Sequence, residues 1–446
     1  MPTLRTESQS ASLEVSDLKE TWHILDPEER IEAFVELDRG DAEDFFLDLP
    51  ARDQVELLMA MSPPQRRSWM RLLPPDDAAD VIQGADDAAR DALLDLLDGP
   101  TRAEVQALLA YAEDDAGGLM NPRYARIRPD VSIDEAISYL RRQARDKLEN
   151  LYYIYVIDAD QKLQGVISLR DLFTSSPDKK VRDICGDRGD LVVAGESMDQ
   201  EELSRLFAEH DLQAIPVVDA EGRMKGIVTV DDIVDVIQEE ATEDIQKIGG
   251  TAALEAPYLQ TGFASLLKKR VGWLAVLFVG EMFTASAMGR FEHEIARAVV
   301  LSLFIPLIIS SGGNAGSQAS TLVIRAMALG EVSLGDWWRV VRREVFQGFA
   351  IGAILGVIGF VRVILWEWIF HSYGIHATLV GVTIFASVLG VVTFGTVAGA
   401  GLPLALRRVG LDPASASAPF VATFVDVTGI IIYFTVASLV LRGTLL

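Results

Sequence analysis

The chain has 446 residues and a formal net charge of −25, so it is too long for one ordinary domain and strongly acidic. Residues 1–260 carry 56 Asp and Glu against 27 Lys and Arg, whereas residues 261–446 carry 9 against 13. A field this negative repels nucleic acid and attracts cations, so we expect no nucleic-acid partner. The single cysteine, Cys185, excludes a disulfide framework, and five histidines provide no hydrolase-type metal cluster, so we expect no enzyme.

The first 119 residues predict an all-α domain. Residues 1–20 are polar and are expected to be disordered, and they lack the apolar core of a secretory signal, so the soluble half should stay in the cytoplasm. Residues 21–119 predict short amphipathic helices separated by proline breaks such as Ser62-Pro-Pro64 and Leu73-Pro-Pro75. Units of about 20–25 residues recur, which indicates a superhelical stack.

A clearer repeat follows at residues 154–171 and 215–232. Each copy contains a strand, an acidic turn, a second strand that is opened by glycine, and a Ser/Thr-x-x-Asp entry into a helix. A predicted helix precedes each copy, at residues 132–143 and 198–210. This α+β duplication resembles a tandem CBS pair, a regulatory module that senses ligands in many transporters and enzymes. We expect the two modules at residues 120–180 and 181–240.

The second half of the chain predicts a membrane domain. Residues 241–270 connect the halves as a helix that is weakened at Gly249-Gly250 and at Pro257. Five apolar segments follow, and each is long enough to cross about 30 Å of hydrocarbon. They lie at about residues 271–290, 298–324, 345–370, 377–406 and 420–441, within a domain that spans residues 271–446. The distribution of Lys and Arg favours cytoplasmic N-terminal domains and an outside C-terminus.

The fifth apolar segment contains a carboxylate, Asp426. A charge at bilayer depth costs about 2.5–3.5 kcal/mol on insertion scales, so such residues usually face an interior or a water-filled path. Thr423, Thr428 and Gly429 could present further oxygens to a cation on that path. The alternative is an ion pair between Asp426 and Arg362, which lies deep in another apolar segment.

The second apolar segment is unusually polar. It contains Pro306 and the sequence Gly-Gly-Asn314-Ala-Gly-Ser-Gln318, and such a broken backbone is tolerated only where it is buried or lines a cavity. Asn314 is therefore a candidate pore-lining residue, and close helix packing through small residues is the alternative. One carboxylate cannot enclose a divalent ion such as Mg²⁺, which needs six oxygens and often keeps several waters. A two-fold axis near Asp426 would supply a second carboxylate, which favours a homodimer.

Residues 20–446 together resemble the MgtE family of bacterial magnesium channels or transporters. The most specific motifs are Gly-Gly-Asn-x-Gly-x-Gln in the second segment and Pro-Phe-Val-x-Thr-x-Val-Asp-Val-x-Gly in the fifth. The resemblance implies a multidomain membrane protein with an acidic helical N-terminal domain, tandem CBS modules, a plug helix and five spans. It implies Mg²⁺ uptake through the bacterial inner membrane, with Asp426 as the carboxylate that selects hydrated Mg²⁺.

The resemblance also implies that cytoplasmic Mg²⁺ closes the pore by binding between carboxylates of the soluble domains and the plug. The matching positions are Asp76, Asp80, Asp199, Glu201, Asp211, Asp232, Asp235, Glu240, Glu243 and Asp244. Without Mg²⁺ the like-charged domains repel one another, and bridging ions would draw them together as a population shift. Thr229 and Asp232 resemble the contact through which CBS pairs bind adenine nucleotides, so Asp232 could serve ATP, Mg²⁺ or both.

Two other functions stay open at this point. One is an alternating-access carrier for another divalent cation, such as Co²⁺, with Asp426 coupled to protons. The other is a nucleotide-regulated CBS protein whose membrane half serves mainly as an anchor, although an anchor needs neither Asn314 nor Asp426. The family pattern gives no role to Glu281 or Arg362, and we expect Arg362 to pair with Glu281 or Glu367, or to extend to the interface.

Overall fold

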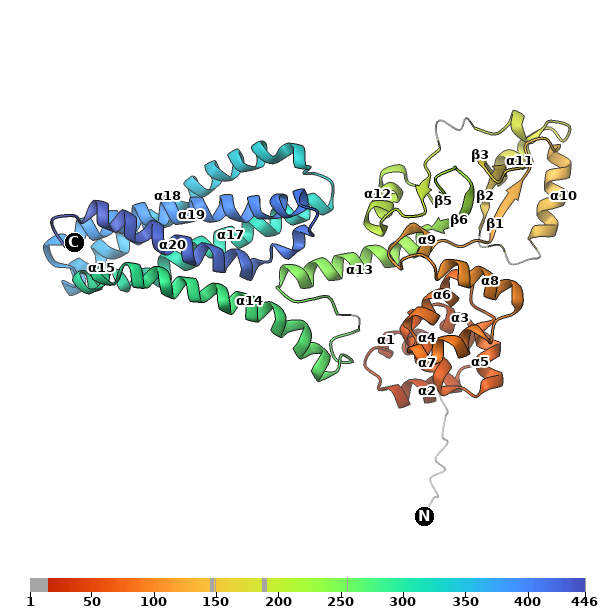
Figure 1. Ribbon diagram of the computed structural model, residues 1–446, viewed down its shortest axis with the longest axis horizontal. Helices are drawn as coiled ribbons and strands as arrows, with labels where there is room; N and C mark the ends of the chain where they lie inside the picture. The colour runs from red at the N-terminus through yellow and green to blue at the C-terminus, as the bar shows by residue number, and fades with distance from the viewer. Residues whose placement is uncertain (1–14, 145–147, 149, 187–190, 255, 446) are drawn as a thin grey trace, which may run out of the picture. The chain divides into compact units, whose positions relative to one another are not determined.

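The computed structural model describes residues 15–144, 148, 150–186, 191–254 and 256–445. The chain divides into two compact units, Met1–Glu239 and Glu240–Leu446 (Figure 1). Each unit has its own hydrophobic core.

The first unit opens with a stack of short helices. These are α1 (Val15–Thr21), α2 (Pro27–Glu36), α3 (Arg39–Leu47), α4 (Ala51–Ala60), α5 (Pro63–Met70), α6 (Pro75–Gly84), α7 (Asp87–Leu94), α8 (Gly99–Leu108) and α9 (Ala116–Leu119). Proline begins α2, α5 and α6, where its missing N–H costs no helical hydrogen bond. Buried aromatic side chains, among them Phe34, Phe45 and Phe46, fill the space between the helices. The all-α prediction for this region is confirmed.

The expectation of a disordered segment over residues 1–20 is wrong for its last part, because residues 15–20 belong to α1. Leu18 is completely buried, and the following Trp22 packs edge-on against Phe45 with ring centroids 4.9 Å apart. These two apolar side chains give the short helix a place in the core. Residues 1–14 of that prediction lie outside the described part of the chain.

The two repeat copies form two three-stranded sheets with the same topology. The strands are β1 (Tyr124–Ile127), β2 (Asn150–Ile157), β3 (Leu163–Ser168), β4 (Ala194–Gly195), β5 (Ala214–Val218) and β6 (Met224–Thr229). In each sheet the first strand pairs parallel to the second, and the second pairs antiparallel to the third. The intervening helices are α10 (Ile133–Gln143), α11 (Leu169–Thr174), the 3-10 helix η1 (Val181–Asp183) and α12 (Gln200–His210). The predicted duplication is confirmed.

The glycine of each repeat occupies the same register position. Gly165 lies opposite Val156, and Gly226 lies opposite Val217. A Cβ on Gly165 would lie 2.1 Å from Cys185 Sγ, and a Cβ on Gly226 would lie 2.8 Å from a backbone oxygen. Any side chain at these two positions would collide with its neighbours, which explains the matching glycines.

The connection between the halves is two helices rather than one weakened helix. α13 (Val230–Ile248) starts directly after β6, and α14 (Phe263–Arg290) starts fifteen residues after α13 ends. Gly250 adopts a left-handed conformation with φ of +77°, which ends α13, and Pro257 lies in the segment between the helices. The prediction of a single helix over residues 241–270 is therefore wrong.

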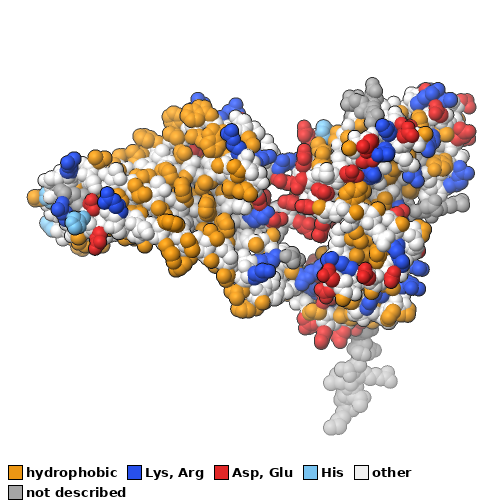
Figure 2. Space-filling model, in the orientation of Figure 1, with side chains coloured by type: hydrophobic (Ala, Val, Ile, Leu, Met, Phe, Trp, Pro, Cys, Tyr) orange, Lys and Arg blue, Asp and Glu red, His pale blue; other side chains and the backbone are white. Residues whose placement is uncertain are grey.

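The second unit contains five helices that are long and apolar enough to cross a membrane, by length and composition. After α14 come α15 (Glu292–Arg297), α16 (Val299–Ser302), α17 (Ile305–Ala328), η3 (Leu334–Asp336), α18 (Trp337–Phe370), η4 (Gly374–His376), α19 (Ala377–Arg408), η5 (Pro413–Ser415) and α20 (Ala418–Val440). Figure 2 shows apolar side chains over the surface of this unit, and exposed ones include Phe278, Phe346 and Trp368. The predicted five-span domain is confirmed.

Glycine allows the central helices of this unit to approach closely. A Cβ on Gly399 of α19 would lie only 2.0 Å from the backbone oxygen of Gly316 on α17. Gly352 and Gly356 of α18 meet the backbone of α19 in the same way. Small residues therefore bring α17, α18 and α19 into backbone contact, as they commonly do in membrane proteins. Close helix packing, which the sequence offered as the alternative explanation for the glycines of the second apolar segment, is therefore present.

Candidate functional site

Three helices of the second unit meet at Asp426. Its half-buried carboxyl group on α20 lies within hydrogen-bonding reach of the carboxyl group of Glu281 on α14. Next to Glu281, a Cβ on Gly280 would lie 2.7 Å from the methyl group of Thr423. On α17, a Cβ on Gly313 would lie 3.9 Å from Asp426 Oδ1. The pair of carboxyl groups thus lies where α14, α17 and α20 converge.

The other predicted pore residues differ in how far they are exposed to solvent. Thr423 and Thr428 are half-buried, and the hydroxyl group of Thr428 donates to the backbone oxygen of Phe424 at 3.1 Å. Asn314 is exposed, and its amide nitrogen donates to Ser310 Oγ at 3.4 Å. Gly429 is buried, and a Cβ there would lie 2.9 Å from Ile309 Cδ1. Gly429 therefore allows close helix packing, and its place beside a cation path stays a prediction.

Arg362 has aromatic and hydroxyl neighbours. Its Nη1 donates to the hydroxyl oxygen of Tyr373 at 2.8 Å, and its guanidinium lies 4.7 Å from the ring centre of Trp366 and 5.2 Å from that of Phe304. Glu367 accepts hydrogen bonds from the backbone nitrogens of residues 373 and 374 instead. Within the described part of the chain, Arg362 pairs with none of Asp426, Glu281 and Glu367, so both pairing expectations are wrong. The guanidinium instead lies over aromatic rings, an arrangement that stabilises a cation.

A group of carboxylates in the first unit surrounds Asp80 of α6. Burial, followed by repulsion from the carboxylates of Asp77, Glu113, Asp232 and Glu239, raises the pKa of Asp80 from 3.8 to about 7. Burial also raises the pKa of Asp232 to about 6, although hydrogen bonds from Thr229 oppose this shift. Two of the predicted regulatory residues, Asp80 and Asp232, are therefore brought together from distant parts of the sequence. Mutual repulsion of this kind would be relieved by a cation.

The sequence pattern missed three members of this group. Asp77 lies beside the predicted Asp76, and Glu239 lies beside the predicted Glu240, so a wider window around each motif would have included both. Glu113 lies between α8 and α9, outside any helical face, and no local signal identifies it.

Asp76 has a structural contact. Its side chain is 7% exposed and accepts a hydrogen bond from Asn121 Nδ2 at 3.1 Å. The backbone of Asn121 in turn exchanges hydrogen bonds with Ile227 of β6, at 2.7 and 3.0 Å. Asp76 thus joins the helical domain to the second sheet.

The predicted residues around α12 are separated by the length of that helix. Asp199 caps its N-terminus by accepting from the backbone nitrogen of Glu201 at 2.9 Å, and Glu201 forms an ion pair with Arg205 at 2.5 Å. Asp211 ends the helix in a left-handed conformation with φ of +51°. At 1.5 Å per residue the two ends lie about 16 Å apart, so these carboxylates do not form one site.

The remaining predicted residues follow α13. Asp235 is exposed one turn after Asp232, and burial together with the charge of Asp231 raises its pKa. Glu240 and Asp244 are half-buried, and Glu243 forms an ion pair with Lys247. Across the described residues, the structure contains no group of three or more His, Cys, Asp or Glu side chains arranged to hold a metal.

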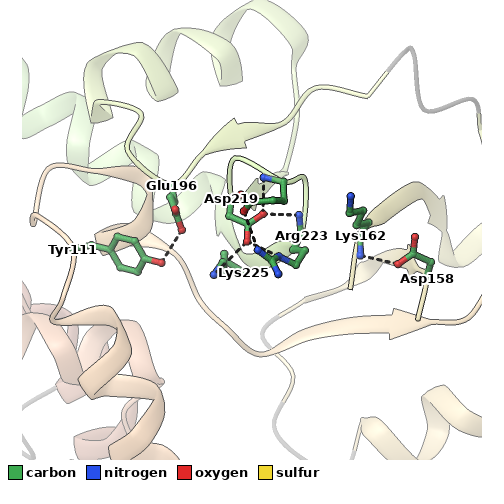
Figure 3. A network of polar contacts seen from close by, with 8 residues as sticks. Tyr111, Asp158, Lys162, Glu196, Asp219, Arg223 and Lys225 are labelled. Atoms are coloured by element: carbon green, nitrogen blue, oxygen red, sulfur yellow. Dashed lines mark hydrogen bonds and ion pairs between the residues drawn. The ribbon is translucent and has the colours of Figure 1, made fainter. Parts of the chain in front are cut away.

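The acidic turns and the nucleotide-type motif of the CBS pair are internally hydrogen-bonded. Figure 3 shows Asp158 accepting from the backbone nitrogen of Lys162 at 3.0 Å, and Asp219 accepting from that of Arg223 at 2.8 Å. Asp219 also forms an ion pair with Arg223 at 2.9 Å. Thr229, which is 5% exposed, donates its hydroxyl hydrogen to Asp232 Oδ2 at 2.7 Å and so helps to start α13.

Comparison with known families divides the chain in the same way. The profile of the MgtE intracellular N domain matches residues 13–114, and that of the CBS domain matches residues 116–178 and 181–239. The MgtE profile, described as a divalent cation transporter, matches residues 305–436.

Relatives of known name extend over most of the chain. The magnesium transporter MgtE of Thermus thermophilus is 40% identical over 430 residues, which cover 96% of this chain and 93% of the relative. That of Enterococcus faecalis is 34% identical over 76% of this chain and 72% of the relative. A solved cytosolic domain of the Mg²⁺ channel MgtE in complex with ATP is 42% identical, with a TM-score of 0.46 over 50% of this chain and 90% of that one. From the match in all its domains and the near full-length identity, this chain belongs to the MgtE family of divalent cation transporters.

Proposed function

We propose that this protein conducts Mg²⁺ across the bacterial inner membrane and that Asp426 is the carboxylate that selects the ion. The observation that carries the proposal is the pair of carboxyl groups, Asp426 and Glu281, where three membrane helices converge. Carboxylates at this depth are costly unless they face an interior or a water-filled path. Two relatives that are named magnesium transporters, one of which matches 96% of this chain, support Mg²⁺ as the transported ion.

The pore chemistry follows from the hydration of the ion. Mg²⁺ gives up its waters reluctantly, so a carboxylate binds it best through its hydration shell. One Asp426 supplies too few oxygens for this, and a second copy of the chain across a two-fold axis supplies the rest. α14, none of whose residues is buried within the single chain, and the exposed Asn314 leave surface for that second copy. Asn314, Thr423 and Thr428 would line the path on either side of Asp426.

The regulatory chemistry is centred on Asp80 and Asp232. Their carboxylates repel one another and the neighbouring Glu113 and Glu239, and a Mg²⁺ ion between them would remove this repulsion. The conformation in which they are close would then be favoured by cytoplasmic Mg²⁺, which closes the pore. Asp76 would act through its contact with Asn121, and Asp199 through its cap of α12. The remaining predicted carboxylates would add negative charge around α12 and along α13; they are Glu201, Asp211, Asp235, Glu240, Glu243 and Asp244. ATP would compete with Mg²⁺ at Asp232 next to Thr229.

The same proposal gives the protein its place in the cell. The N-terminal domains would face the cytoplasm and the C-terminus the outside, and transport would proceed without a catalysed reaction. A proton-coupled carrier for Co²⁺ is not favoured, because the relatives are named magnesium transporters. A comparison of Mg²⁺ and Co²⁺ flux, with and without a proton gradient, distinguishes the two functions.

The test is ion flux into liposomes that contain the purified protein. Wild type should pass Mg²⁺ in preference to Ca²⁺, Co²⁺ and K⁺, internal Mg²⁺ should reduce the flux, and Asp426→Asn should pass no Mg²⁺. Wild-type Mg²⁺ flux through the Asp426→Asn variant, or flux that requires a proton gradient, would contradict the proposal.

A further inference from the structure

Lys247, one residue before the end of α13, contacts two carboxylates at once. Its Nζ lies 2.6 Å from Asp412 Oδ2 and also pairs with Glu243, one turn earlier on the same helix. Partial burial disfavours the ammonium ion, but the hydrogen bonds and charges of Asp412 and Glu243 outweigh this and raise the pKa of Lys247. Lys247 is therefore charged throughout the physiological pH range.

Asp412 lies in the loop that connects α19 to α20. Its Oδ1 accepts from the backbone nitrogen of Ala414 at 2.8 Å, which starts η5. The loop ends at Ser417, which is completely buried and whose Oγ accepts from the backbone nitrogen of Phe420 at 3.3 Å. From that cap α20 runs without interruption to Asp426. The position of this loop thus sets the position of the helix that carries the pore carboxylate.

Two other membrane helices hold the same loop. On α17, Ser317 Oγ donates to the backbone oxygen of Ala418 at 3.0 Å, and Ser320 Oγ donates to that of Ala416 at 2.8 Å. On α14, Trp273 Nε1 donates to Ser417 Oγ at 3.0 Å. Residues 412–419, which comprise this loop and the first two residues of α20 and which we term the α20 entry loop, are therefore fixed to α14 and α17.

The chain that leaves α13 also packs against the α20 entry loop. A Cβ on Gly250 would lie 3.0 Å from Trp273 Cδ1 and 3.2 Å from Pro419 Cγ. The end of α13 and the residues after it consequently meet the α20 entry loop at two points, through the charge of Lys247 and through the backbone at Gly250. A substitution at Gly250 would add a side chain where Trp273 and Pro419 already lie, whereas a substitution at Lys247 removes the charged contact without adding bulk.

We propose that Lys247 is a positioning residue for regulated transport, because its ion pair with Asp412 fixes the end of α13 to the α20 entry loop. A movement of α13 then reaches α20 directly, and closing by cytoplasmic Mg²⁺ depends on this contact. This inference rests on the proposed function, since its measurement is the inhibition of Mg²⁺ flux by internal Mg²⁺.

The experiment measures Mg²⁺ flux of the full chain in liposomes at a series of internal Mg²⁺ concentrations, each variant being normalised to its own flux without internal Mg²⁺. Lys247→Gln and Asp412→Asn should each raise the half-inhibiting Mg²⁺ concentration by about fivefold, the size expected for one partly exposed ion pair. The double variant should shift it no further than either single variant, because both remove the same contact. Lys247→Arg should keep the wild-type value.

Lys268→Gln is the matched control, because Lys268 is an exposed lysine at the start of α14. It should leave the half-inhibiting concentration unchanged. A wild-type value in Lys247→Gln, or additive shifts in the double variant, would overturn the inference. If Lys247→Gln fails to fold, the reciprocal exchange Lys247→Asp with Asp412→Lys decides: recovery of inhibition supports the ion pair, and a loss that persists in the folded double variant opposes it.

Asp426→Asn is measured in parallel to separate the two proposals. Mg²⁺ flux through that variant would contradict the proposed pore. If Asp426→Asn passes no Mg²⁺ and Lys247→Gln is still inhibited as wild type is, the proposed pore stands and the role of Lys247 is excluded.

Discussion

The two adjacent carboxyl groups in the membrane unit differ in their surroundings. Asp426 is half-buried among apolar helices, whereas Glu281 lies on the exposed face of α14. Two carboxylates in contact repel one another, and a cation near both of them removes this repulsion. A passing hydrated cation would satisfy both groups, and Asp426 would lose more by its absence because it is the more buried.

We therefore predict that Glu281→Gln lowers Mg²⁺ flux by about tenfold, roughly the effect of 1.4 kcal/mol, whereas Asp426→Asn abolishes it. Liposome flux at low internal Mg²⁺ measures both. Glu292→Gln, which neutralises an exposed carboxylate of α15, serves as the control and should behave as wild type. Equal, undiminished flux in Glu281→Gln would show that Glu281 is outside the cation path.

The raised pKa of Asp80 predicts a pH-dependent stability of the first unit. The folded state holds the Asp80 proton up to a pH of about 7, while the unfolded state releases it near 3.8. Folding is therefore not penalised below pH 3.8, and the penalty grows as the pH rises to about 7 and is complete above it.

Asp80→Asn should accordingly stabilise the metal-free protein at pH 8, on the order of 2 kcal/mol, and much less at pH 5. Thermal unfolding in chelator, with Asp91→Asn as the exposed control on α7, measures the difference. Added Mg²⁺ should stabilise wild type at pH 8 more than Asp80→Asn. A variant that is destabilised at pH 8 would exclude the repulsion that we infer around Asp80.

At the scale of elements, the sequence predicted what depends on local pattern. The two CBS copies were located because Gly165 and Gly226 fall at one register position in each hairpin. The end of α13 was not located, because glycine and proline show where a helix can stop without showing which of them adopts the left-handed conformation. Gly250 is the residue that adopts this conformation, and its backbone packs against Trp273 and Pro419.

Helix contacts in the membrane unit give a matched pair of substitutions on α19. A Cβ at Gly399 would lie 2.0 Å from the backbone oxygen of Gly316, whereas a Cβ at Gly401 would lie 3.6 Å from the ring of Trp337, an ordinary contact. Gly399→Ala should destabilise the unit by about 1–3 kcal/mol through forced separation of α17 and α19. Gly401→Ala should be neutral or slightly stabilising. Thermal unfolding in detergent compares the two, and equal stabilities would contradict the contact.

At the scale of the whole molecule, composition and hydropathy predicted the division into an acidic half and an apolar half with five spans. The candidate site was predictable only in part. Asp426 is apparent because a carboxylate stands out in an apolar segment, whereas the proximity of Glu113 to Asp80, or of Asp412 to Lys247, depends on how distant segments pack. No local pattern encodes those distances.

Because each unit has its own core, we predict that a chain lacking residues 1–239 still conducts Mg²⁺ but is no longer inhibited by internal Mg²⁺. The reason is that Asp80, Asp232 and their neighbouring carboxylates all belong to the part removed. Liposome flux of the truncated and full-length proteins at low and high internal Mg²⁺ measures this. A truncated protein that is fully inhibited by internal Mg²⁺ would place the sensor in the second unit.

α13 is one unbroken helix of 19 residues from the end of β6 to Ile248, about 28 Å long at 1.5 Å per residue. A rod of that length amplifies motion: tilting its first turn by about 10° would sweep the far end sideways by about 5 Å, nearly one helical pitch. A small tilt of the helix at Asp232 would thus become a larger movement of Lys247, which its ion pair with Asp412 would pass to the α20 entry loop.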